Sequence, residues 1–250
     1  MSVGGVVLLV AAGVAAGLSG SIAGLASLFS YPALLAAGLP AVSANVTNTV
    51  ALTLNGVGSA ANSRRELTGQ GPALRRFVLV AGLGGATGAA LLLGTPSEAF
   101  ERIVPFLVAV GSVALILQPR LRAAAVRRGS GTGGGWAVPG LFAVMVYGGY
   151  FGAAAGVLVL ALLVAALPVS LLEGNALKNV LLGVANGVAA LGFAVFGPVV
   201  WTAVLPLAAG VLAGSWAGPA VARRLPADAL RIAIGLAGLG LAGALALQAY

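Results

Sequence analysis

The apolar segment Leu171–Phe196 restricts the fold of this chain more than any other stretch, because it is long enough to cross a bilayer as one helix yet contains polar residues. Asn175, Lys178, Asn179 and Asn186 fall within an arc of roughly 100° on one face of that helix. Lys178 is the only lysine in the chain. A polar stripe around one cation is costly in lipid and marks a substrate or ion pathway, although a lysine near a helix end can also extend to the lipid headgroups.

The composition places the whole chain in a membrane. Of its 250 residues, 60% are hydrophobic and 7% are charged, which is far outside the range of a soluble domain. We therefore predict an all-α polytopic membrane protein. The net charge of +8 comes mainly from arginines in short loops between apolar segments, so it reports orientation in the bilayer and not a nucleic-acid partner.

The chain contains no histidine and no cysteine, which restricts its chemistry. The string Gly17-Leu-Ser19-Gly20 matches the GxSG of intramembrane serine proteases, but without a histidine it has no general base. Metal-cation transport is disfavoured because Cys, His and paired intramembrane carboxylates are missing. We therefore predict no enzyme activity, no metal and no cofactor.

The first apolar stretch, Val3–Gly38, has a length that fits no simple span. As one helix it would be about 54 Å long, whereas a hydrocarbon core is about 30 Å thick and two full spans need about 40 residues plus a turn. It is interrupted by the Ser/Gly-rich stretch Gly17–Gly24 and by Pro32. We predict a re-entrant hairpin of two half-helices that meet at the Ser/Gly-rich stretch, with two full spans as the alternative. Such a break is tolerated only where protein or a water-filled cavity surrounds it.

The second half of the chain repeats the first. Its opening stretch Trp136–Leu167 is again long, and it is broken at Tyr147-Gly-Gly-Tyr-Phe-Gly152. Polar residues recur at an offset of 130 or 131 positions, in the pairs Asn45 and Asn175, Asn48 and Asn179, and Asn55 and Asn186. We therefore divide the chain into a first membrane repeat (1–118), a cytoplasmic basic and glycine-rich linker (119–135) and a second membrane repeat (136–250).

Loop charges predict that the two repeats have opposite orientations. Positive loops face the cytoplasm, which places Arg64–Arg76 and Arg120–Arg128 inside and the turn Glu98–Arg102 outside. The turn Arg223–Arg231 is basic and therefore inside, yet it corresponds by repeat to the outer turn of the first half. An odd number of crossings per half satisfies both conditions. We predict two inverted repeats, each with one re-entrant or broken helical hairpin and three transmembrane helices, and both termini outside.

These motifs resemble the sulfite exporter TauE/SafE family over nearly the whole chain. In the second half the resemblance rests on Tyr147–Leu163, Asn175-Ala-Leu-Lys-Asn179 and Phe196-Gly-Pro-Val-Val-Trp201, and in the first half on Gly17–Gly38 and the region Ala44–Thr49. It implies an integral membrane exporter of small sulfur oxyanions or organosulfonates in a bacterial-type plasma (inner) membrane. Family members commonly have a GxGGG-like run at the first break, where this chain has Ala23-Gly-Leu-Ala-Ser27, so the identity of the anion stays open.

The polar residues of both halves suit a small anionic substrate. Asparagine amides and hydroxyl groups donate hydrogen bonds, and Lys178 supplies a compact positive charge. Half-helix N-termini at Ser19–Gly24 and Gly148–Gly152 would add N–H donors and positive dipole ends. The predicted substrate-binding residues are Asn45, Asn48, Thr49, Asn175, Lys178, Asn179, Asn186, Ser19, Ser21 and Tyr150. Glu173 has two interpretations, a capping residue at the helix end or a coupling group near Lys178.

The predicted mechanism is alternating access at a midplane site between the two repeats. A passive anion channel is the alternative, because neither a polar stripe nor an inverted repeat separates a channel from a carrier. The lipid bilayer is the obligatory partner of such a chain. The coupling ion, a proton or sodium, and assembly into a homo-oligomer are left open by the sequence.

Overall fold

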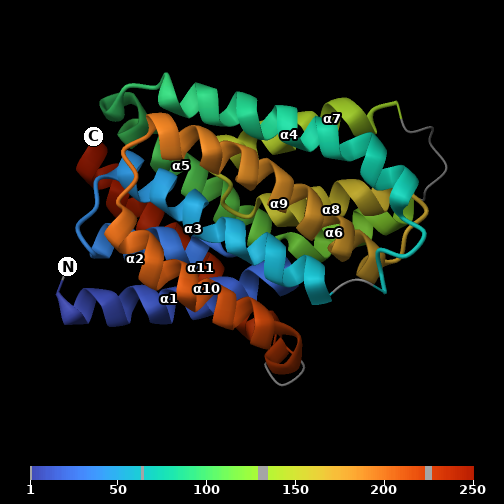
Figure 1. Cartoon of the computed structure of the whole chain (residues 1–250), viewed down its shortest axis with the longest axis horizontal. Helices are drawn as coiled ribbons and strands as arrows, with labels where there is room; N and C mark the ends of the chain where they lie inside the picture. Colours follow the sequence, from blue (N-terminus) through green and yellow to red (C-terminus); the bar gives the residue numbers. More distant parts are fainter. Residues whose placement is uncertain (1, 63–64, 129–134, 223–226) are drawn as a thin grey trace.

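The structure is a computed structural model that describes residues 2–62, 65–128, 135–222 and 227–250. Within these ranges the chain is all-helical and contains no strand. The helices in chain order are α1 (Val3–Ala23), α2 (Ser27–Ala36), α3 (Ala41–Asn62), α4 (Gly71–Leu93), α5 (Ser97–Ile116), α6 (Gln118–Arg128), α7 (Ala137–Tyr150), α8 (Ala155–Ala166), α9 (Leu171–Phe196), α10 (Trp201–Ala222) and α11 (Ala227–Ala249). They run mostly along one long axis, and both termini lie at the same end of the molecule (Figure 1).

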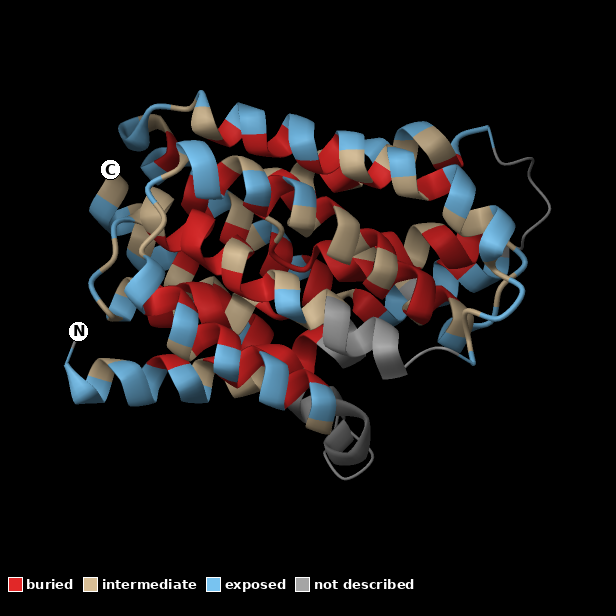
Figure 2. Cartoon of the chain, in the orientation of Figure 1, coloured by how far each residue is buried: buried red, intermediate tan, exposed pale blue. Residues whose placement is uncertain are grey.

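Five helices in the described part of the chain are long and apolar enough to cross a membrane. They are α1, α4, α5, α9 and α11, which confirms the prediction of an all-α polytopic membrane protein. The buried residues form a continuous core along the molecule, while the outward faces are exposed (Figure 2). Many of the exposed side chains are large and apolar, among them Leu79, Leu83 and Trp216. Such an exterior is stable in contact with lipid acyl chains and not with water.

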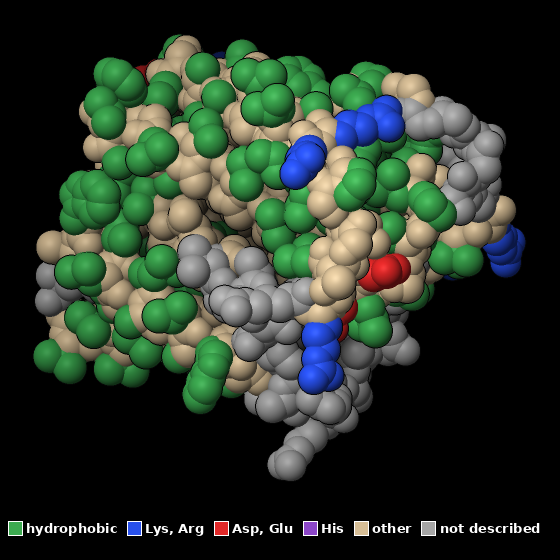
Figure 3. Space-filling view, turned by 45° about the vertical axis from the view of Figure 1, so that its right-hand side comes forward, with side chains coloured by type: hydrophobic (Ala, Val, Ile, Leu, Met, Phe, Trp, Pro, Cys, Tyr) green, Lys and Arg blue, Asp and Glu red, His purple; other side chains and the backbone are tan. Residues whose placement is uncertain are grey.

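Charged side chains are sparse on this exterior. The face in Figure 3 is covered mostly by hydrophobic side chains, and its arginines gather toward the right-hand side. Arg64, Arg223, Arg224 and Arg231, on which the orientation of the loops partly depends, lie outside the described residues or side chains. The inverted orientation of the repeats therefore stays a prediction.

The first hairpin does not consist of two half-helices as predicted, because α1 has 21 residues and is long enough to cross a membrane, whereas α2 has 10. α1 continues as a helix through Gly17–Ala23 and ends where Gly24 adopts φ 73° and donates its N–H to the Gly20 carbonyl. The glycines in this stretch serve close packing: a Cβ atom on Gly13 or Gly17 would collide with the backbone of α10. The break in the first half is therefore the short segment 24–26, and it lies at the C-terminal end of the Ser/Gly-rich stretch instead of within it.

The second hairpin has the predicted form of two half-helices. α7 has 14 residues and α8 has 12, so they measure about 21 Å and 18 Å and neither can cross a bilayer alone. Between them, Gly152 and Ala154 adopt φ 76° and 55°. The Tyr147 hydroxyl donates to the Ala153 carbonyl across this break at 2.7 Å, which holds the non-helical segment in place. We call segments 24–26 and 151–154 the first and the second break.

Helices of one half pack against helices of the other in matched pairs. α1 lies along α10 and α7 lies along α4, while α3 packs against α9 and α5 against α11. If α1 is paired with α7, α2 with α8, and so on by the sequence repeat, each of these contacts has its counterpart. An internal duplication whose halves exchange contacts produces this arrangement. The segment that joins the halves includes α6, whose Ala125 packs on Leu160 and Val164 of α8.

Candidate functional site

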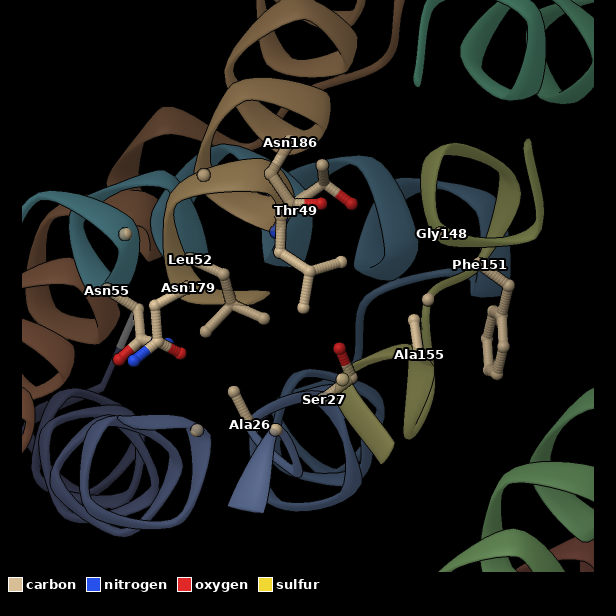
Figure 4. Close-up of a pocket in the computed structure, with 17 residues that line it drawn as sticks. Ala26, Ser27, Thr49, Leu52, Asn55, Gly148, Phe151, Ala155, Asn179 and Asn186 are labelled. Atoms are coloured by element: carbon tan, nitrogen blue, oxygen red, sulfur yellow. The ribbon is translucent and has the colours of Figure 1, made fainter. Parts of the chain in front are cut away.

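A cavity of about 50 Å³ lies where the two breaks meet the middle of α3 and α9 (Figure 4). The first break contributes Gly24 and Ala26, and the second contributes Phe151 and Gly152. A volume of this size accommodates a few water molecules or one small anion. The cavity therefore lies at the position that the sequence predicts for a substrate, between two interrupted helical segments.

Two pairs of glycines bring the elements around the cavity together. A Cβ atom on Gly24 would lie 2.5 Å from the Cα of Gly156, which is closer than real contacts allow. A Cβ atom on Gly56 of α3 would lie 2.7 Å from the Cα of Gly183 of α9. Each pair takes one glycine from each half of the chain. The prediction that the two breaks approach one another is thereby confirmed.

The polar side chains that line the cavity come from α3 and α9. Thr49 and Asn55 lie on α3, and Asn179 and Asn186 lie on α9. The Thr49 hydroxyl donates to the Asn45 carbonyl at 3.1 Å, so it presents its oxygen to the cavity as an acceptor. The buried Asn55 Oδ1 has no hydrogen-bond partner among the described residues. A buried amide oxygen without a partner is costly, and only a donor such as water can satisfy it, whereas the Nδ2 group of the same carboxamide is the end that can donate to an anion.

Two helices begin at the cavity. α2 starts at Ser27 and α8 at Ala155, and these two residues and Gly156 belong to its lining. Each helix N-terminus carries about half a positive charge. Several of the first N–H groups are already bonded: those of Leu28 and Phe29 donate to the Leu25 and Ala26 carbonyls, and those of Ala155 and Val157 donate to the Gly152 and Ala154 carbonyls. The sequence places these N-termini a few residues too early, because α1 and α7 extend further than their glycines suggest. One helix N-terminus from each half thus lies at the cavity, and the binding of an anion by these ends stays a prediction.

Asn45 and Asn48 contact the two helical hairpins and not the cavity. The Asn45 Nδ2 group donates to the carbonyl of Tyr150 at the end of α7, at 2.8 Å. Asn48 uses both ends of its amide on α2: its Oδ1 accepts from the Ser30 hydroxyl and its Nδ2 donates to the Ser27 hydroxyl at 3.2 Å. Both side chains are almost fully buried. They tie α3 to the ends of the helices that border the breaks.

Lys178 is fully buried, with 0% of its surface exposed. Its Nζ donates to Asn175 Oδ1 at 2.8 Å, one helical turn toward the start of α9. It directly precedes Asn179 in sequence, but it is not itself part of the cavity lining. No acidic side chain in the described part of the chain forms an ion pair with it. A buried ammonium next to a neutral amide, without an ion pair among the described residues, is costly unless a counter-ion binds near it.

The remaining predicted residues have other positions. Ser19 donates to the Ala16 carbonyl within α1, and the Tyr150 hydroxyl donates to Thr95 Oγ1 at 3.3 Å, away from the cavity. The Ser21 side chain lies outside the described residues. Glu173 forms a capping box with Ser170 at the start of α9 and accepts from Gln70 at 3.3 Å. Of its two interpretations, the capping residue is the one for which the contacts are present.

Two cavity residues with polar side chains are absent from the predicted set, Ser27 and Asn55. A signal for Asn55 exists in the sequence, because Asn55-Gly56-Val57 and Asn186-Gly187-Val188 correspond at an offset of 131. Ser27 has no such signal: only the position at which α1 ends makes it the first residue of α2.

The fold and this cavity define an integral membrane protein with a small polar site between two broken helical hairpins. Comparison with family models gives the class its name, since residues 9–245 match the family described as Sulfite exporter TauE/SafE. The match covers most of the chain, and the protein belongs to this family. No curated protein and no solved structure matches the chain.

Proposed function

We propose that this protein exports a small sulfur-containing anion, sulfite or an organosulfonate, across a bacterial-type inner membrane. Membership of the TauE/SafE family makes it a membrane transporter of the sulfur-anion exporter type and not an enzyme. The observation that carries the finer proposal is the cavity in which the N-termini of α2 and α8 meet polar side chains of α3 and α9. Sulfonate oxygens accept hydrogen bonds from N–H groups and amides of this kind.

In the proposed site the anion lies between the two helix N-termini, and the amides of Asn55, Asn179 and Asn186 donate to its oxygens. Lys178 supplies the positive charge. Its ammonium lies buried beside this part of α9, held by Asn175, and in the membrane interior the substrate is its natural counter-ion. Transport then requires no metal ion.

Alternating access of the two halves is the mechanism that the packing supports. α1 and α2 of the first half exchange contacts with the second half in the same way as α7 and α8 do with the first. A site at the boundary of two such halves is exposed to either side in turn when one half rocks against the other. We propose the inverted repeats 1–118 and 136–250 as these halves, joined by residues 119–135.

Counterflow in proteoliposomes tests this function. Proteoliposomes that contain the purified protein are loaded with unlabelled sulfite, sulfate, thiosulfate or isethionate, and the uptake of labelled sulfite from outside is followed. A carrier for sulfur anions accelerates uptake only with its own substrates inside, and the rate saturates. Uptake without acceleration or saturation would instead support the passive channel, and no uptake of any sulfur anion would refute the proposal.

The orientation of the halves is tested separately by single cysteines, because the chain has none of its own. Cysteines at Arg65 and Ala227 are expected to react with an impermeant maleimide from the cytoplasmic side only. Labelling of the Ala227 position from outside in intact cells would refute the inverted arrangement.

A further inference from the structure

A second, larger hollow lies at the end of the molecule where the two termini are. It has a volume of about 500 Å³ and opens to the surface. Its lining includes Leu35 and Pro40 after α2, Glu101 and Val104 of α5, and Gln248 near the C-terminus. We call this hollow the vestibule. It is ten times larger than the cavity, and part of its lining, in residues 35–41, lies in sequence between the α2 and α3 residues that line the cavity.

Three buried aromatic side chains lie between the cavity and the vestibule. Phe151 of the second break lines the cavity, and its ring packs edge-on against Tyr31 of α2, with 5.2 Å between ring centroids. Phe151 also contacts Phe100, at 6.3 Å, and Phe100 directly precedes Glu101 of the vestibule. All three are at most 3% exposed. The aromatic cluster Tyr31, Phe100 and Phe151 is therefore a packed connection from the lining of the cavity, through Phe151, to the residue next to Glu101 of the vestibule.

The hydroxyl group of Tyr31 is unsatisfied in this cluster. Tyr31 is 2% exposed, and its hydroxyl has no hydrogen-bond partner among the described residues. The Glu101 carboxylate of the vestibule is close enough to interact with it electrostatically. A buried hydroxyl without a partner destabilises the packed arrangement, and it would gain partners if the cluster opened to water or to a polar solute.

Hydrogen bonds from α3 hold the elements that carry this cluster. Asn45 binds the carbonyl of Tyr150, the residue before Phe151. Asn48 binds Ser27 and Ser30, and Ser30 is the residue before Tyr31. Both aromatic residues are thus fixed through their neighbours in sequence. When these bonds are broken, the second break and the start of α2 lose their attachment to α3.

We infer that Tyr31, Phe100 and Phe151 form a gate between the cavity and the vestibule, and that Asn45 and Asn48 are positioning residues that hold this gate closed. The inference rests on the proposed function in one respect, that the gate lies on the route of the substrate to the terminal end. Asn45 and Asn48 then act on transport through the breaks, without contact with the anion. The gate is closed in this structure.

Thiol accessibility tests the gate without any substrate. Ala155→Cys places a thiol in the cavity, and Gln248→Cys places one in the vestibule as a control. Both are treated with an impermeant maleimide in intact cells and in inverted vesicles, which shows which face the vestibule lies on. From that face we expect Gln248→Cys to react fast and Ala155→Cys slowly. Adding Asn45→Ala should accelerate only the reaction of Ala155→Cys, by about fivefold or more.

Two further variants separate a gate from a merely structural cluster. Phe151→Leu removes one ring from the aromatic cluster and should also accelerate labelling of Ala155→Cys. Tyr31→Phe should act in the opposite direction and slow it about fivefold, because the closed state no longer buries an unpaired hydroxyl. A structural role alone predicts that all three changes loosen the protein and raise labelling together.

The inference is overturned if Ala155→Cys reacts as fast as Gln248→Cys in the otherwise unchanged chain, or if Asn45→Ala and Phe151→Leu leave its rate unchanged. These outcomes are independent of the counterflow result. A protein that transports no sulfur anion but shows the gated labelling would refute the proposed substrate and keep the gate. Saturable sulfite counterflow, together with labelling of Ala155→Cys that is as fast as that of Gln248→Cys, would support the proposed substrate and refute the gate.

Discussion

The polar faces of α3 and α9 correspond by the sequence repeat, but their contacts differ. On α3, the side chains of Asn45 and Asn48 bind the elements next to the two breaks, and Thr47 accepts from the Val200 N–H at 3.0 Å. On α9, Asn175 accepts from Lys178, which has no charged counterpart in the first half. The face of α3 is therefore occupied with holding the structure, whereas α9 carries the buried charge.

This difference shows that an internal repeat conserves position more than role. Both faces contain three amides at nearly the same spacing, and both lie against the breaks. Only one of them has an ammonium group whose charge is uncompensated within the described protein. The predictions below separate the two roles, since changes at Lys178 and Asn186 of α9 should act on the anion, whereas changes at Asn48 of α3 should act on stability.

Lys178→Met should have the largest effect. Removing the positive charge beside the cavity should reduce sulfite affinity on the order of 100-fold or more, because a buried ammonium attracts an anion strongly in a medium of low dielectric constant, even from outside the cavity lining. The thermal midpoint should stay equal or rise, since methionine of similar length replaces a buried charge. Isothermal titration and thermal unfolding in detergent measure the two quantities.

Lys178→Arg is the matched control and should restore part of the affinity, because a planar guanidinium replaces a point donor. Wild-type affinity in the methionine variant would show that Lys178 has no part in binding and that its aliphatic chain serves packing alone.

Gly24→Ala should have the next largest effect, now on stability. Its Cβ would collide with Gly156 and would also occupy a left-handed conformation, at a combined cost of about 3 kcal/mol. Gly38→Ala is the control for conformation alone, because Gly38 has φ 89° but open space around it, and it should cost about 1 kcal/mol. Equal losses in thermal unfolding would mean that the breaks are not in close contact.

Much of the fold could be predicted because membrane insertion makes hydrophobicity and length decisive. The helical class, the position of α9 and the existence of the second break followed from these two quantities, but that break lies at 151–154 and the predicted Tyr147–Gly152 is helical up to Tyr150. The first break lies a few residues later than predicted, because glycine has two structural roles that the sequence alone does not distinguish. Gly17 permits close packing on α10, whereas Gly24 terminates the helix with a positive φ. Only the neighbouring helix distinguishes them.

The site could be predicted less completely for a different reason. Residue type and repeat spacing identify polar groups on the correct helices, and Thr49, Asn179 and Asn186 do line the cavity. They do not reveal how each group is already bonded. Asn48 and Asn55 lie on the same helix and look equivalent in sequence, yet Asn48 is saturated by two serines while Asn55 has a free amide oxygen.

Asn48→Ala should mainly lower the stability of the protein, whereas Asn186→Ala should mainly weaken sulfite binding, and both effects should be moderate. Asn48→Ala removes two buried hydrogen bonds and should lower the free energy of unfolding by about 2 kcal/mol. Asn186→Ala should change it by less than about 0.5 kcal/mol, because this residue is half-buried at the cavity, but it should weaken sulfite binding several-fold. Comparing unfolding and titration of the two variants checks both. If Asn186→Ala instead destabilises the protein without weakening binding, the division of roles between α3 and α9 is wrong.

Glu173→Gln should have the smallest effect of all. Glu173 is the only acidic residue near the polar stripe of α9, so it is the one carboxylate there that could carry a coupling proton. Its contacts are those of a helix cap, with the Ser170 N–H at 2.7 Å and the Gln70 amide at 3.3 Å. Glutamine keeps the capping geometry and cannot ionise. We therefore expect unchanged sulfite counterflow with an unchanged pH profile. A flattened pH profile at unchanged protein stability would assign Glu173 to coupling and place a second functional charge on the same helix as Lys178.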